Sequence, residues 1–198
     1  MKLSLFNSTL FIMIQNQYDN LYTTDMFDTT KVPDNINVSS YSSHLNLGCK
    51  IYVNNIFNYM RLDPTFDEGI ACVTKGMHRR TLIKKKKKKP TSSAFNNSID
   101  LDILMNIDRD KPRRVNIKIF NNERGTIQLS GCKECRDGNE AVSRIISELN
   151  KDYYVYRGGK FEKIQMYEGD ICPKNVTIDM INTDYRIDMK IDRDKLYE

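Results

Sequence analysis

Residues 115–131 read VNIKIFNNERGTIQLSG, and their pattern indicates the fold class. Val115, Ile117 and Ile119 alternate with polar residues, which is typical of a strand with one buried face. The Asn and Gly residues that follow supply a turn, and a second alternating run begins at Ile127. The stretch therefore predicts an antiparallel hairpin with one apolar face.

A helix is predicted directly after this hairpin, over 138–150, with Asp137 as its cap. Its apolar face is formed by Ala141, Val142, Ile145, Ile146 and Leu149. Strands followed by a helix that covers their apolar face indicate a mixed α/β protein of the α+β kind, with an antiparallel sheet.

The same patterns extend the sheet in both directions. They predict strands over 36–47, 70–74, 99–105 and 176–191, a helix over 53–61, a hairpin over 153–167 around Gly158-Gly159, and an amphipathic helix within 1–35. The last strand has no visible local partner.

Composition excludes several classes of protein. The 198 residues are 39% apolar, and no uninterrupted apolar run approaches the ~20 residues that cross a bilayer, so we expect no membrane partner. Five scattered cysteines and an N-terminus without a signal cleavage site favour an intracellular protein.

The basic charge is concentrated in one segment. Lys84 to Lys89 are consecutive, and without these six charges the net charge of +5 becomes −1. We expect 78–98 to form a mobile loop. The lysine run is either a solvated loop or an arm that contacts phosphates or serves as a nuclear localisation signal.

No motif for catalysis is present: the two histidines stand alone, and the chain has no phosphate-binding glycine loop. We therefore expect neither enzyme activity nor a cofactor. Cys132 and Cys135 have the spacing of a metal or redox pair, or they are small buried thiols in a strand-to-helix turn.

Two phenylalanines, Phe66 and Phe120, lie at predicted strand ends beside turns. Each is either a core residue or an exposed wedge that enters between base steps from the minor groove. Spacing and composition do not decide between these roles.

Several segments resemble the TATA-box-binding protein family. NLGCKI at 46–51, FDEGIACV at 66–73, and IF at 119–120 followed by LSGCK at 129–133 are similar to the first repeat of that family. Residues 178–196 resemble the start of a second repeat. NIKIFNN with IQLSGCK, and the lysine-rich insertion, look most like the family members of large DNA viruses.

The resemblance implies a curved antiparallel sheet backed by helices, with one complete repeat and the start of a second, truncated one. The expected units are an N-terminal extension over 1–35, the first repeat over 36–152 with a basic insertion at 78–98, a connecting hairpin over 153–175, and the second repeat from 176 to 198.

The resemblance also implies a non-enzymatic transcription initiation factor that binds and bends AT-rich double-stranded promoter DNA through the minor groove. Its partners would be a transcription factor IIB-like protein and RNA polymerase, in the host nucleus or a cytoplasmic viral factory. One rival is a protein-interaction scaffold with the same fold and no DNA bending, and another is a nonspecific binder that uses only the lysine loop.

The DNA-contacting residues that it implies fall into three groups. The wedges are Phe66 and Phe120; the base-edge neighbours are Ser130, Gln128 in place of an apolar contact, and either Ser40 or Asn37; the phosphate contacts are Arg79, Arg80, Lys84, Lys85, Lys86, Lys87, Lys88 and Lys89.

Overall fold

A computed structural model describes residues 21–23, 26, 36–62, 69–82, 97–105 and 113–185. Its elements are β1 (Ile36–Asn46), β2 (Lys50–Ile51), α2 (Val53–Tyr59), β3 (Gly69–Lys75), β4 (His78–Thr81), β5 (Ser98–Met105), β6 (Arg113–Phe120), β7 (Thr126–Cys132), α3 (Cys135–Leu149), β8 (Tyr153–Arg157), β9 (Lys160–Ile164), β10 (Tyr167–Glu168) and β11 (Lys174–Tyr185). Within the described residues, antiparallel strand pairing and two helices confirm the α+β class.

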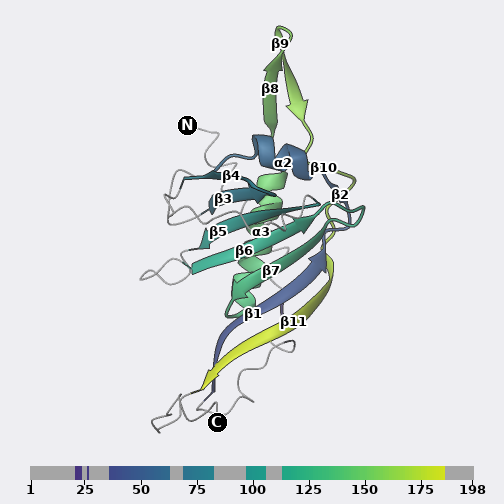
Figure 1. The fold of residues 1–198 in the computed structure, drawn as a ribbon. Helices are drawn as coiled ribbons and strands as arrows, with labels where there is room; N and C mark the ends of the chain where they lie inside the picture. Colours follow the sequence, from purple (N-terminus) through teal and green to yellow (C-terminus); the bar gives the residue numbers. More distant parts are fainter. Residues whose placement is uncertain are drawn as a thin grey trace, which may run out of the picture.

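Seven strands form one sheet in the order β11-β1-β7-β6-β5-β3-β4 (Figure 1). The hairpin predicted at 115–131 is its centre, where β6 and β7 pair from Asn116–Ser130 to Ile119–Ile127. The last strand finds its partner in β1, more than a hundred residues earlier, and the two pair from Ile36–Tyr185 to Asn46–Lys174.

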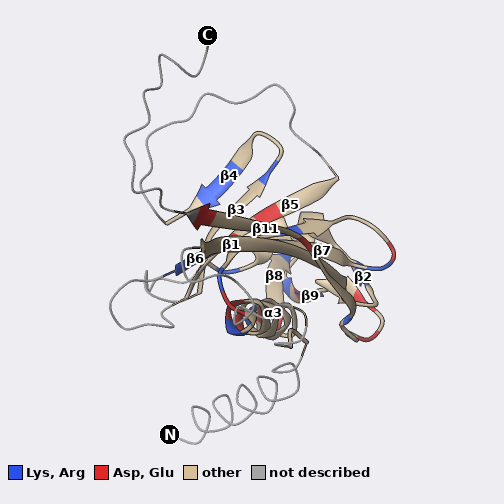
Figure 2. Ribbon diagram, turned by 90° about the horizontal axis from the view of Figure 1, so that it is seen from below, with Lys and Arg blue, Asp and Glu red and all other residues tan. Residues whose placement is uncertain are grey.

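The core lies between one face of this sheet and α3 (Figure 2). Every second residue of the central strands points into it, and Leu45, Ile117 and Leu129 are fully buried. The apolar face predicted for α3 packs against them, with Ile145 at 0% exposed. The alternation in the sequence thus follows directly from a sheet that is covered on one face.

The helix α3 begins at Cys135, three residues before the predicted start. Asp137 is therefore not the residue before the helix but lies in its first turn, where a negative charge is favourable. Its carboxylate accepts hydrogen bonds from the backbone N–H of Lys133 (2.7 Å) and Glu134 (3.1 Å). Arg113 donates to both oxygens at 3.0 and 2.9 Å and ties the start of β6 to the helix.

The prediction of a mobile loop over 78–98 is wrong at both ends of that range. His78–Thr81 forms β4, which pairs with β3, and Ser98 opens β5. The charged sequence concealed β4 because its basic side chains do not need burial to complete a ladder of backbone hydrogen bonds. Residues 83–96, with the lysine run, lie outside the described part of the chain.

Most of the helix predicted within 1–35 also lies outside the described residues, but Tyr22 is buried at 2% exposed. Its hydroxyl lies 2.8 Å from Ser43 Oγ on β1. The Asn139 amide accepts from the Tyr22 N–H (2.8 Å) and donates to the Tyr22 carbonyl (3.1 Å). Tyr22 is therefore held between β1 and α3.

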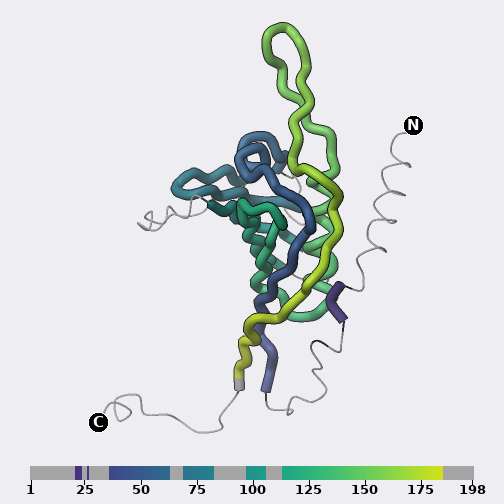
Figure 3. Tube along the Cα trace, turned by 90° about the vertical axis from the view of Figure 1, so that its right-hand side faces the viewer, coloured from purple at the N-terminus to yellow at the C-terminus, as the bar shows by residue number. Residues whose placement is uncertain are grey.

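The hairpin predicted around Gly158-Gly159 is confirmed as β8 and β9. Both glycines have positive φ, 54° and 85°, a conformation that glycine adopts without a steric cost. The hairpin projects beyond the sheet (Figures 1 and 3).

Candidate nucleic-acid interface

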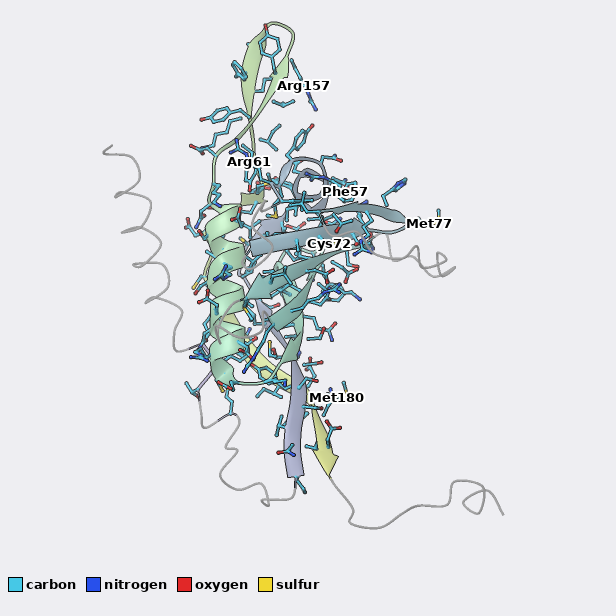
Figure 4. The ribbon with its side chains drawn as sticks, turned by 90° about the vertical axis from the view of Figure 1, so that its left-hand side faces the viewer. Phe57, Arg61, Cys72, Met77, Arg157 and Met180 are labelled. Atoms are coloured by element: carbon cyan, nitrogen blue, oxygen red, sulfur yellow. The ribbon has the colours of Figure 1, made fainter. Side chains whose placement is uncertain are left out.

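The sheet face opposite α3, here called the open face, carries no described helix (Figure 4). It is reached by the alternate residues of each strand that do not enter the core. Its central members are Ser40, Ser42, His44 and Asn46 of β1, Thr126, Gln128 and Ser130 of β7, Asn116, Lys118 and Phe120 of β6, and Asn182 of β11. The open face is therefore mainly polar, whereas the opposite face is apolar. The apolar side chains of the open face include Phe120 of β6 and Met180 of β11, which is 53% exposed and pairs with Ser42.

Backbone register places these side chains in two rows across the strands. One row contains Asn116, Ser130 and Ser42, because Asn116 pairs with Ser130 and Ser130 pairs with Ser42. The other row contains Lys118, Gln128 and His44. Two of the predicted base-edge residues, Gln128 and Ser130, thus occupy neighbouring rows, both of them half-buried.

The first-strand alternatives, Ser40 and Asn37, are placed differently. Ser40 pairs with Asn182, whose Nδ2 donates to Ser40 Oγ at 3.0 Å. Asn37 is exposed and pairs with Asp184 nearer the start of β1. Ser40 therefore forms a cross-strand polar pair with β11, and Asn37 lies outside both rows.

Only one of the two predicted wedges, Phe120, lies within the described part of the chain. Phe120 ends β6 on the open face, is half-buried, and pairs with Ser98. Phe66 lies outside the described residues. The nearest described position, Gly69, pairs with Leu104, at the opposite end of β5 from Ser98. The neighbour of β6 is β5, and β3 lies one strand further away.

Of the adjacent arginines, only Arg79 belongs to the open face. Its Nε donates to Cys72 Sγ at 2.9 Å, and its Nη2 lies 4.0 Å from Asp102 Oδ2. Arg80 points to the other face and donates to the carbonyl oxygens of Phe57 (2.5 Å) and Met60 (3.0 Å) at the end of α2. Arg80 is therefore committed to the helix, as alternation along β4 requires. The predicted contacts Lys84 to Lys89 lie outside the described residues.

Sequence reasoning missed two acidic residues of β5 on this face, and also Asp179 of β11, whose Oδ1 lies 2.6 Å from Nδ1 of His44. Asp102 is 6% exposed and accepts hydrogen bonds from Arg114 and from Asn116 Nδ2 (3.2 Å). Asp100 lies 3.7 Å from Lys118 Nζ, and burial raises its pKa more than this lysine lowers it. The signal was available, since both carboxylates alternate with the buried residues of β5.

The cysteine pair shows no feature of a reactive or metal-binding site. Burial raises the pKa of Cys132 to about 12 and also raises that of Cys135, so neither favours the thiolate that reacts or binds metal. No group of three or more His, Cys, Asp or Glu within the described ranges is placed to hold a metal ion. In the same ranges, no helix is long and apolar enough to cross a membrane.

Comparison with known proteins supports the resemblance found in the sequence. No family model matches the chain, and no solved structure matches it significantly. Over 120 residues it is 34% identical to a protein of Acanthamoeba polyphaga mimivirus named TATA-box-binding protein-like. The match covers 60% of this chain and 32% of that relative, so the chain matches about a third of the relative's length. The chain is thus similar, over part of its length, to one mimivirus protein of this name.

Proposed function

We propose that this chain is a DNA-binding transcription initiation factor of the TATA-box-binding type, which binds and bends AT-rich promoter DNA through the minor groove. The observation that carries the proposal is the open face, whose polar rows run continuously from β6 through β7 to β1. The name of the mimivirus relative supports the same class of function.

Side-chain chemistry on the open face fits the minor groove. An A·T pair presents only acceptors there, adenine N3 and thymine O2, whereas G·C adds the guanine amino donor. Hydroxyl and amide groups such as those of the half-buried Ser130 and Gln128 can donate to these acceptors. A half-buried Phe120 at the end of β6 supplies one apolar side chain that can enter between base steps and kink the duplex.

The arrangement of strands fits one TATA-binding-protein-like repeat and the start of a second. In this assignment β1 to α3 form the first repeat, and β11 is the first strand of the next. Antiparallel pairing of β11 with β1 then places the Ser40–Asn182 pair at the junction between repeats.

The remaining features of the proposal follow from the type of factor. We assign no catalytic activity and no cofactor to the chain. Its partners would be a transcription factor IIB-like protein and RNA polymerase, and it would act in the host nucleus or a cytoplasmic viral factory.

One observation favours a second candidate, a scaffold of the transcription machinery that does not bend DNA. Asp100 and Asp102 place two carboxylates on the open face, where they would oppose phosphates. Lys118, Arg114 and Arg79 lie close to these carboxylates and offset their charge, so we place the DNA-binding function first.

The two adjacent arginines provide a matched test. We expect Arg79→Met to weaken binding to an AT-rich duplex and to reduce the slope of log affinity against log salt by about 0.9, the value for one phosphate contact. Arg80→Met should leave the slope unchanged, because its guanidinium contacts α2. Absence of duplex binding by the wild-type chain would favour the scaffold, and equal effects of the two variants would contradict the assigned faces.

A further inference from the structure

The β8–β9 hairpin exposes three aromatic rings on one face. Tyr154, Tyr156 and Phe161 are 58%, 63% and 73% exposed. Tyr156 and Phe161 are cross-strand partners whose ring centroids lie 5.1 Å apart. These rings take no part in the core, and the hairpin pairs with no other described strand. The Tyr156–Phe161 pair can stabilise its own hairpin, but packing of the main core does not explain why the rings are so exposed.

The opposite face of the hairpin holds it in position. Tyr153 is buried at 4% exposed, and Arg157 Nη2 donates to Tyr59 Oη of α2 at 2.6 Å. At the base, Lys163 Nζ lies 2.5 Å from Asp152 Oδ1. The ring pair is thus presented on a supported ribbon, and rigid aromatic side chains bind at a low cost in conformational entropy.

The charge at the tip defines the chemistry of a partner. Residues 156–161 read YRGGKF, with two cations, Arg157 and Lys160. Glu162, the next residue, lies 3.7 Å from Lys160 Nζ, so the three side chains together carry a net charge of +1. These cations lie on the face opposite the ring pair, because Arg157 pairs with Lys160 and Tyr156 pairs with Phe161. A partner that encloses the tip would meet an apolar surface on one side and positive charge on the other.

This division between faces favours a protein over a nucleic acid. A single strand that stacks its bases on the rings needs basic side chains along the same face for its phosphates. Here that face offers Lys163, which is paired with Asp152. Protein interfaces, by contrast, concentrate binding energy in tyrosine and arginine with charges at the rim.

We propose that the tip of the β8–β9 hairpin, residues 156–161, is a docking site for an acidic protein segment that carries large apolar side chains. Tyr156 and Phe161 contact the apolar side chains, and Arg157 and Lys160 attract the carboxylates. Docking here does not depend on DNA binding by the open face, so the two functions can fail separately.

The test uses the whole chain and a fluorescein-labelled 20-residue peptide with five repeats of Asp-Phe-Glu-Leu. A basic peptide with Lys and Arg in place of the acids, and an acidic one with Ser and Gly in place of Phe and Leu, serve as controls. Fluorescence anisotropy should show binding of the first peptide only. The Tyr156→Ser/Phe161→Ser double variant should weaken it at least about tenfold, as loss of a central aromatic pair does.

Two further variants distinguish docking at the hairpin tip from nonspecific hydrophobic binding. Lys160→Glu should also weaken binding of the acidic peptide. Met77→Ser, at a position equally exposed (73%) in the β3–β4 turn, should have no effect (Figure 4). All variants lie on the surface and should keep the wild-type unfolding midpoint.

Three outcomes would overturn the proposal. The first is binding of the acidic apolar peptide that the double variant leaves unchanged, or no binding at all. The second is binding of a dT20 oligonucleotide that depends on Tyr156 and Phe161, which would assign the rings to a nucleic acid. The third is a wild-type dimer, by light scattering, that the double variant dissociates, which would assign them to a second copy.

Discussion

Replacing Gly138 with alanine tests the buried packing of Tyr22 between β1 and α3. In an ordinary helix interior this change stabilises by about 1 kcal/mol. At position 138 the added Cβ would lie 2.8 Å from two ring carbons of Tyr22 and 2.7 Å from Tyr41 Oη. Both tyrosines are buried, so displacing them costs about 1–3 kcal/mol. We expect the clash to outweigh the helix propensity, with a net loss of about 1 kcal/mol.

Urea unfolding of a double-mutant cycle measures this clash. Tyr22→Ala alone should lower the free energy of unfolding by about 3–5 kcal/mol, the cost of truncating a buried aromatic residue. In that background Gly138→Ala should become neutral or stabilising, with a coupling energy of at least about 1 kcal/mol. The reasoning is refuted if Gly138→Ala stabilises the wild-type chain, or if it has the same effect in both backgrounds.

Other predictions concern single side chains. Asp100→Asn should raise the free energy of unfolding at pH 7 and leave it unchanged below about pH 3. The reason is that burial raises the pKa of Asp100, so its ionised form is unfavourable in the folded state. Urea titrations at both pH values measure the two free energies of unfolding. Arg80→Met should lower the free energy of unfolding by about 1–2 kcal/mol, because two carbonyls at the end of α2 lose a charged donor. Iodoacetamide at pH 8 should modify the exposed Cys172 and leave Cys132 unmodified, because burial raises the pKa of Cys132 to about 12. Cys132 should react only after urea unfolds the chain, and peptide mass mapping identifies the modified cysteines.

The sequence predicted the elements that local patterns determine. Alternation fixed the β6–β7 hairpin, and the spacing of apolar residues fixed the apolar face of α3. It could not predict the pairing of β11 with β1, because that pairing joins segments far apart in the chain. The strand β4 was missed because its residues are polar or charged. Backbone hydrogen bonds to β3 form without any apolar side chain, so no hydrophobic pattern marks this strand.

The residues of the candidate site were predicted by the family resemblance, and strand register determines how they lie relative to one another. Gln128 and Ser130 were identified from the resemblance, and the sheet order brings them beside Lys118 and Asn116. The adjacent Arg79 and Arg80 look equivalent in the sequence, and only the alternation of a strand separates them. The pairing of Phe66 with Phe120 stays a prediction.

The measurement that tests the central claim most directly compares AT-rich and GC-rich duplexes of equal length, each labelled at both ends for energy transfer, with the wild-type chain and Phe120→Ala across a salt series. We predict that the wild-type chain prefers the AT-rich duplex at least about tenfold and shortens its end-to-end distance. Phe120→Ala should lose both effects and keep the same salt slope, because the ring contacts bases and not phosphates. Equal affinity for the two duplexes, or bending that Phe120→Ala leaves intact, would contradict a minor-groove factor that works through the open face.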